Sequence, residues 1–162
     1  MSVKTFATGA LIGVALSLGA AGSAAAATPP AHELRVSGAM DLSLNQGRKW
    51  ETDDALRQGM AAIRETMART LGSLHTGTFS PAQYAELAVA LEGQIDGITK
   101  NCRLSPDADA QLHIVLARIM EGIEGLKADA GRDRVRGAMT VVMALATYGG
   151  YFDHPGWQPI GH

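Results

Sequence analysis

The chain has 162 residues, of which 46% are hydrophobic, 19% charged and 5% aromatic, and its formal net charge is −2. This apolar content excludes a disordered chain, and a single cysteine excludes both an internal disulfide and a multi-cysteine zinc or iron–sulfur site. The small net charge gives no electrostatic footprint for nucleic acid, so we expect no nucleic-acid partner.

Residues 1–27 have the three-part pattern of a secretory signal peptide. Lys4 supplies the positive charge, an apolar stretch runs from Ala7 to Ala21, and Ala25-Ala26-Ala27 fits the A-x-A cleavage rule. A membrane anchor is the alternative, but the apolar stretch is shorter than the roughly 18–20 residues that a span needs. We therefore predict a periplasmic protein that begins near Thr28 and keeps no stable membrane anchor after cleavage.

Residues 28–50 are predicted to form an extended arm. Pro29 and Pro30 block a helix, residues 32–36 alternate in the manner of a short strand, and Asn45-Gln46-Gly47 is typical of a turn.

Residues 51–162 are predicted to form a four-helix bundle domain with a C-terminal tail. A first helix over about 53–74 starts at Thr52 as N-cap and stops at Gly77. The second and third helices start at Ser80-Pro81 and Ser105-Pro106, where a capping serine precedes a proline. Each of the three helices has an apolar stripe at helical spacing. The first helix has Leu56, Met60, Ile63, Met67, Leu71 and Leu74, and the second has Tyr84, Leu87, Leu91, Ile95, Ile98 and Cys102. The third has Leu112, Val115, Ile119, Ile123 and Leu126, beside a second stripe of His113, Leu116, Met120 and Ile123.

A fourth helix is predicted over about 132–148 and ends at Gly149-Gly150. Its predicted inner face consists of Val135, Met139, Val142, Leu145 and Ala146. Four helices joined by short links favour an all-α, antiparallel up-down-up-down bundle, here with an extended N-terminal arm and an irregular aromatic tail. Residues 153–157 of the tail are expected to fold back over the bundle end, close to Trp50 and the link between the second and third helices, because buried aromatic rings would hold them there.

The sequence gives no indication of an enzyme. It has no G-x-S-x-G nucleophile turn, no glycine-rich phosphate loop and no C-x-x-C-H haem attachment motif. Neither His113 nor His154 has a glutamate three residues before it, which argues against a di-iron bundle. We therefore expect a protein without catalytic residues.

The candidate ligands are soft or borderline donors: Met60, Cys102, His113 and His154. An antiparallel bundle places all four toward one end, and thiolate, thioether and imidazole donors suit Cu(I). The alternatives stay open for each residue: a methionine or cysteine that fills the core, a core histidine, and a histidine that caps a helix. The sequence therefore predicts a binding protein for a soft transition metal such as copper, with these four residues as its metal ligands.

Three stretches resemble a group of small exported, largely uncharacterised proteobacterial helical proteins. They are Leu44-Asn45-Gln46-Gly47-Arg48-Lys49-Trp50 with the segment to Met60, Asn101-Cys102-Arg103-Leu104 with the segment to His113, and Thr147-Tyr148-Gly149-Gly150-Tyr151-Phe152-Asp153-His154-Pro155-Gly156-Trp157. The resemblance implies a periplasmic helical protein and supplies no reaction.

The architecture is also similar to bundles of the cytochrome b562 type, in which a methionine and a histidine hold haem. Met60 with His154 would take these roles, and Met60 with His113 is the other pairing, although His154 lies beyond the fourth helix. Binding of haem b is therefore one alternative function. A cofactor-free structural or partner-binding protein is another.

Overall fold

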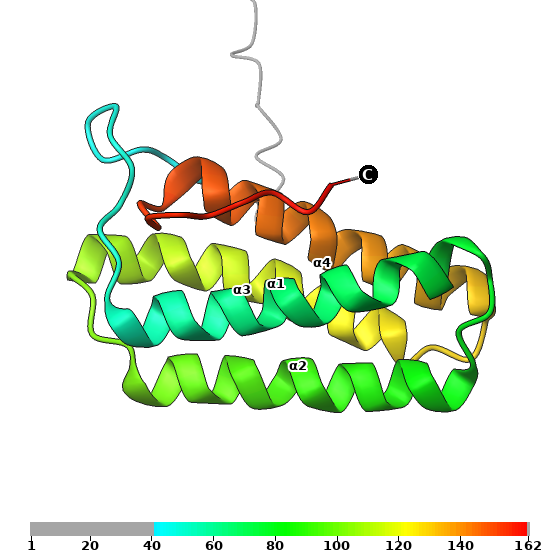
Figure 1. Cartoon of the computed structure of the whole chain (residues 1–162). Helices are drawn as coiled ribbons and strands as arrows, with labels where there is room; N and C mark the ends of the chain where they lie inside the picture. Colours follow the sequence, from blue (N-terminus) through cyan, green and yellow to red (C-terminus); the bar gives the residue numbers. More distant parts are fainter. Residues whose placement is uncertain (1–40, 162) are drawn as a thin grey trace, which may run out of the picture. The chain divides into compact units, whose positions relative to one another are not determined.

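The computed structural model describes residues 41–161. It contains four helices: α1 (Asp54–His75), α2 (Pro81–Asn101), α3 (Pro106–Leu126) and α4 (Gly131–Tyr151). Successive helices run antiparallel, α1 packs against α2 and α4, and α3 packs against the same two helices (Figure 1). The predicted all-α four-helix bundle is confirmed. The predicted signal peptide and the part of the arm before residue 41 lie outside the described residues.

The helix starts follow from their capping residues. The Ser80 hydroxyl accepts from the Gln83 N–H while the Gln83 side chain accepts from the Ser80 N–H, which completes a capping box, and Ser105 caps α3 in the predicted way. The first helix differs from the prediction. Its N-cap is Asp53 rather than Thr52, because the Asp53 carboxylate accepts from the Leu56 N–H.

The core lies between the four helices and includes most of the apolar stripes that the sequence predicts for α1, α2 and α3, whereas His113 of the second α3 stripe is exposed. Its largest fully buried side chains are Leu56, Met60, Ile63, Met67, Leu91, Ile98, Leu112, Ile119, Ile123, Leu126, Tyr148 and Phe152. Apart from tyrosine and tryptophan, no residue with a polar or charged side chain is buried among the described ones. Within residues 41–161, no helix is long and apolar enough to cross a membrane.

The backbones of α3 and α4 lie in direct contact at three glycines. A Cβ atom added to Gly137 of α4 would lie 2.6 Å from the Gly122 carbonyl oxygen, and one added to Gly125 would lie 2.7 Å from the Gly137 Cα. Ordinary side chains cannot approach so closely, so glycine at these positions allows the two helices to meet.

This contact decides which face of α4 is buried and corrects the prediction for that helix. Val142 and Leu145 are buried as predicted, but Ala146 is exposed, Val135 is 43% exposed and Met139 is 37% exposed. The buried face instead follows the small residues that contact α3. It comprises Gly137, Ala138, Val141, Val142, Ala144, Leu145 and Tyr148.

The predicted end of α4 at Gly149-Gly150 is also wrong, since the helix continues to Tyr151. The Phe152 N–H donates to the Tyr148 carbonyl at 2.9 Å and closes the last turn. The Lys49 ammonium donates to the Gly149 carbonyl at 2.6 Å, which satisfies one of the carbonyl groups that a helix end leaves unpaired.

The described part of the arm pairs with the C-terminal tail, which we define as residues 152–161. Residues 45–48 form the predicted turn, with positive φ at Gln46 and Gly47. The Trp50 N–H then donates to the Tyr151 carbonyl, and the Asp153 N–H donates to the Trp50 carbonyl, each at 2.8 Å. The tail therefore folds back beside Trp50 as predicted. Its path differs, because it continues along α4 and α1 instead of crossing toward the α2–α3 link (Figure 1).

Candidate functional site

Two of the four predicted ligands, Met60 and His113, lie in unlike surroundings. Met60 is fully buried in the core, whereas the His113 side chain is 63% exposed on α3. The His113 Nδ1 lies 2.8 Å from the Asp109 carbonyl oxygen, one turn earlier in the same helix. One side chain thus points into the core and the other into solvent, so they do not converge.

Cys102 lies at the C-terminal end of α2, beside the start of α1. Its half-buried thiol lies close to the Asp53 carboxylate. Burial, and after it the negative charge of Asp53, raises the pKa of the Cys102 thiol to about 12. The thiol is therefore protonated near neutral pH, whereas metal ligation and nucleophilic attack both need the thiolate.

Asp53 connects the start of α1 with the α2–α3 link at this end of the bundle. Its Oδ1 accepts from the Leu56 N–H of α1 at 2.7 Å, and its Oδ2 accepts from the Arg103 N–H of the α2–α3 link. Burial alone would raise the pKa of Asp53. The two backbone donors, the Cys102 thiol and the Arg57 guanidinium together lower that pKa below its usual value of 3.8.

His154 lies in the tail and contacts the buried end of α4. Its Nδ1 lies 3.0 Å from the Tyr148 hydroxyl, and the Trp157 ring centroid lies 4.9 Å from that of the imidazole. Burial raises the pKa of Tyr148, so the phenol keeps its proton and can donate it to the imidazole. Burial and the nearby Arg57 cation lower the pKa of His154, which favours the neutral, accepting form of the ring.

The structure thus brings Cys102 and His154 to the same end of the bundle, since Cys102 lies close to Asp53 and the neighbouring Thr52 bonds to the Asp153 carbonyl. Met60 and His113 are not part of this cluster. Across residues 41–161, no three or more histidine, cysteine or acidic side chains are grouped so that they could hold a metal ion. Met60 lies among the apolar side chains of the core.

Sequence reasoning missed the roles of Asp53 and Tyr148. Asp53 carried a recognisable signal, because an acidic residue directly before an apolar stripe is a good N-cap, but its contact with the α2–α3 link depends on packing. Tyr148 carried no signal, because its role arises from a tail residue that returns to contact it.

The face of α4 that points away from the core carries exposed apolar side chains. Val135, Met139 and Met143 follow one another at intervals of four residues, and the Met143 side chain is 67% exposed. Ala146 and Gly150 continue the row toward the C-terminal end of the helix and are exposed as well. We name these five residues the α4 outer face.

Charged groups border the α4 outer face. Arg132 and Arg136 lie at its N-terminal end, and Lys49 lies beside Gly149 and Gly150 at its other end. A groove of about 350 Å³ runs between the α4 outer face and α3. Its lining consists of Arg118, Glu121, Thr140, Met143, Ala144 and Thr147.

Comparison of the chain with protein-family models, with curated proteins and with solved structures found no match. The resemblance to exported helical proteins and to cytochrome b562-type bundles therefore stays a prediction.

Proposed function

We propose that this protein is a cofactor-free binding protein that docks an amphipathic, acidic helix of another protein on the α4 outer face. The observation that carries the proposal is the exposed row of Val135, Met139 and Met143 at one-turn spacing. Of the functions that the sequence suggested, this proposal corresponds to the cofactor-free partner-binding protein and replaces copper binding and haem binding.

The spacing of the exposed side chains supports a helical partner. Residues four apart lie on one side of a helix, so a partner helix with apolar anchors at the same spacing can lie along the row. The row from Val135 to Gly150 extends about 22 Å at 1.5 Å per residue, enough for about four turns of a partner helix. Methionine suits such a surface, because its unbranched, polarisable side chain adapts to differently shaped partners.

The charges at the border support an acidic partner rather than a second copy of this chain. Arg118 pairs with Glu121 at 2.8 Å and Arg136 pairs with Asp133 at 3.1 Å, and exposed Arg132 adds a further positive charge. Lys49 adds a positive charge at the opposite end of the row. In an antiparallel pair of two α4 helices, the basic end of each helix would face Lys49 of the other copy, and like charges repel.

Two synthetic helical peptides test the proposal. Both carry the same leucine anchors at four-residue spacing, and one has glutamate and the other lysine at the flanking positions. With ¹³C-methyl-labelled methionine in the protein, the acidic peptide should shift the Met139 and Met143 signals and leave those of buried Met60 and Met67 unmoved. We expect it to bind at least about tenfold more tightly than the basic peptide, because charge complementarity disfavours the wrong partner.

Two variants separate the α4 outer face from general surface hydrophobicity. The double variant Met139→Ser with Met143→Ser should weaken binding by at least about tenfold, since each buried side chain contributes about 1.5–3 kcal/mol. Val89→Ser is the matched control, because Val89 is 68% exposed on α2 and lies outside the row. Equal binding of both peptides, or equal loss in both variants, would contradict the proposal. Concentration-dependent shifts of the same methyl signals without peptide would indicate a second copy as the occupant.

A further inference from the structure

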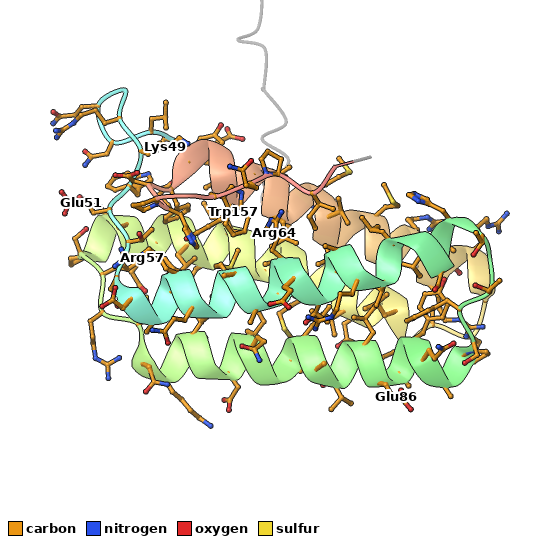
Figure 2. The ribbon with its side chains drawn as sticks, viewed as in Figure 1. Lys49, Glu51, Arg57, Arg64, Glu86 and Trp157 are labelled. Atoms are coloured by element: carbon orange, nitrogen blue, oxygen red, sulfur yellow. The ribbon has the colours of Figure 1, made fainter. Side chains whose placement is uncertain are left out.

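The C-terminal tail is held on the bundle by contacts from both α1 and α4. At its start, the Thr52 hydroxyl donates to the Asp153 carbonyl at 2.6 Å. Further along, the Arg64 guanidinium of α1 donates to the Gln158 carbonyl, and in Figure 2 the labelled Arg64 and Trp157 lie next to each other where the tail passes α1. The tail therefore covers the side of the bundle where α1 and α4 adjoin.

Trp157 occupies a position that only glycine at residue 149 permits. A Cβ atom on Gly149 would lie 2.4 Å from the Trp157 Nε1, so the indole rests directly on the backbone of α4. Its ring packs edge-on against Tyr148, with centroids 4.8 Å apart. The Trp157 Nε1 is buried without a hydrogen-bond partner among the described residues, so the contact is apolar and has no polar bond to strengthen it.

His154 links the tail to the buried phenol of α4. In the neutral ring, Nδ1 can accept the Tyr148 hydroxyl proton across 3.0 Å. In the doubly protonated ring, both nitrogens are donors, so that acceptor is lost and a buried hydroxyl remains to be satisfied. The protonation state of one side chain therefore affects the bond that holds the tail to Tyr148.

We propose that the C-terminal tail is an acid-responsive strap: protonation of His154 breaks its acceptor bond with Tyr148 and releases Trp157 from Gly149, which opens the α1–α4 side of the bundle. This inference does not rest on the proposed function, although the tail borders the Ala146 and Gly150 end of the α4 outer face. The two can fail separately.

The charged groups around His154 come from three elements. The α1 helix contributes Arg57, Arg64 and Glu65, the arm contributes Lys49, and the neighbouring tail residue is Asp153. Arg57 opposes a positive imidazole, while Glu65 and Asp153 would favour it. The lowered pKa of His154 indicates that burial and Arg57 prevail. Each unit of lowering corresponds to about a tenfold change in the ratio of released to bound tail once His154 is fully protonated.

Fluorine NMR of the protein labelled with 5-fluorotryptophan tests the strap. The two tryptophans give separate signals, which the Trp157→Phe variant assigns. As the pH falls from about 7.5 to about 5, below the ordinary histidine pKa of 6.5, the Trp157 signal should move toward its position in solvent while the Trp50 signal stays in place. A Trp157 signal that stays unmoved over this range would overturn the proposal, and so would joint movement of both signals, which indicates global unfolding.

Two histidine variants assign the transition. In His154→Gln, the side-chain amide oxygen can still accept from Tyr148 but does not titrate, so the Trp157 signal should stay in its bound position throughout. His113→Gln is the matched control, because His113 is exposed on α3, and this variant should behave like the natural protein. A persistent transition in His154→Gln would assign the effect to another group and refute the proposal.

Discussion

The carboxylate of Asp53 has three structural roles at the end of the bundle where α1 begins. It caps α1, accepts the backbone N–H of Arg103 in the α2–α3 link, and lies close to the Cys102 thiol. The last contact places a negative charge beside the only cysteine of the chain. Burial and this anionic neighbour both disfavour the thiolate, so we expect Cys102 to react slowly.

The reactivity of Cys102 tests this assignment. We expect its alkylation by iodoacetamide at about pH 8 to be at least tenfold slower than that of a free thiol, because a pKa of about 12 leaves little thiolate. Asp53→Asn should speed the reaction several-fold while α1 remains capped, since asparagine is an equally good N-cap. Mass spectrometry over time measures the modified fraction. A rate in the folded natural protein equal to that of the denatured one would show that neither burial nor Asp53 protects the thiol.

Cys102 also shows the limit of prediction at the level of single residues. Its place on the apolar stripe of α2 was compatible with a small buried side chain as well as with a metal ligand, and the structure shows it half-buried. Its neighbour Asp53 is the N-cap of α1, and the two residues come close only because the bundle brings the start of α1 beside the end of α2. The sequence therefore predicted that Cys102 and His154 share one end of the bundle, but it could not predict which groups determine their protonation.

Among the elements, α4 is the helix whose packing departs from its hydrophobic pattern. In α1, α2 and α3, large apolar residues form the buried stripe, and periodicity predicted their faces. In α4, contact between glycines replaces contact between large side chains, so the helix turns its small residues inward and exposes Val135 and Met139. Hydrophobicity scales give glycine little weight, which explains why this face was predicted wrongly.

A glycine substitution tests the close packing of α3 and α4. Gly137→Ala places a methyl group 2.6 Å from backbone atoms of α3, so we expect a loss of about 2 kcal/mol or more in the free energy of unfolding. Gly93→Ala in α2 is the matched control, because its Cβ meets nothing within 4 Å and alanine should stabilise the helix by about 0.5–1 kcal/mol. Urea denaturation followed by circular dichroism measures both. If Gly137→Ala and Gly93→Ala changed the free energy of unfolding by similar amounts, the close contact between α3 and α4 would be contradicted.

At the scale of the whole molecule, the two segments outside the helices hold each other in place. The arm reaches the tail through the paired backbone bonds between Trp50 and residues 151 and 153, and Phe152 between them is fully buried. Neither segment has a helix to stabilise it, so their order depends on each other and on the aromatic cluster of α4. The sequence predicted that the tail folds back because its aromatic residues need burial. It could not predict the path along α1, because that path depends on the contact of Trp157 with Gly149, which has no side chain to block the indole.

The stability of the molecule should depend on pH in two separate windows. The pKa of His154 is lower in the folded protein than its ordinary 6.5, so the unfolded chain binds more protons and stability falls as the pH drops through and below that value. The pKa of Asp53 is also lowered, from 3.8, so its contribution is present above that value and is lost only as the pH falls further. Urea midpoints at about pH 7.5, 5.5 and 3.5 separate the two groups. His154→Gln should remove most of the fall in the urea midpoint between about pH 7.5 and 5.5 and keep the fall between about pH 5.5 and 3.5. Asp53→Asn should reduce only the fall between about pH 5.5 and 3.5. The assignment to His154 fails if the upper window persists unchanged in His154→Gln.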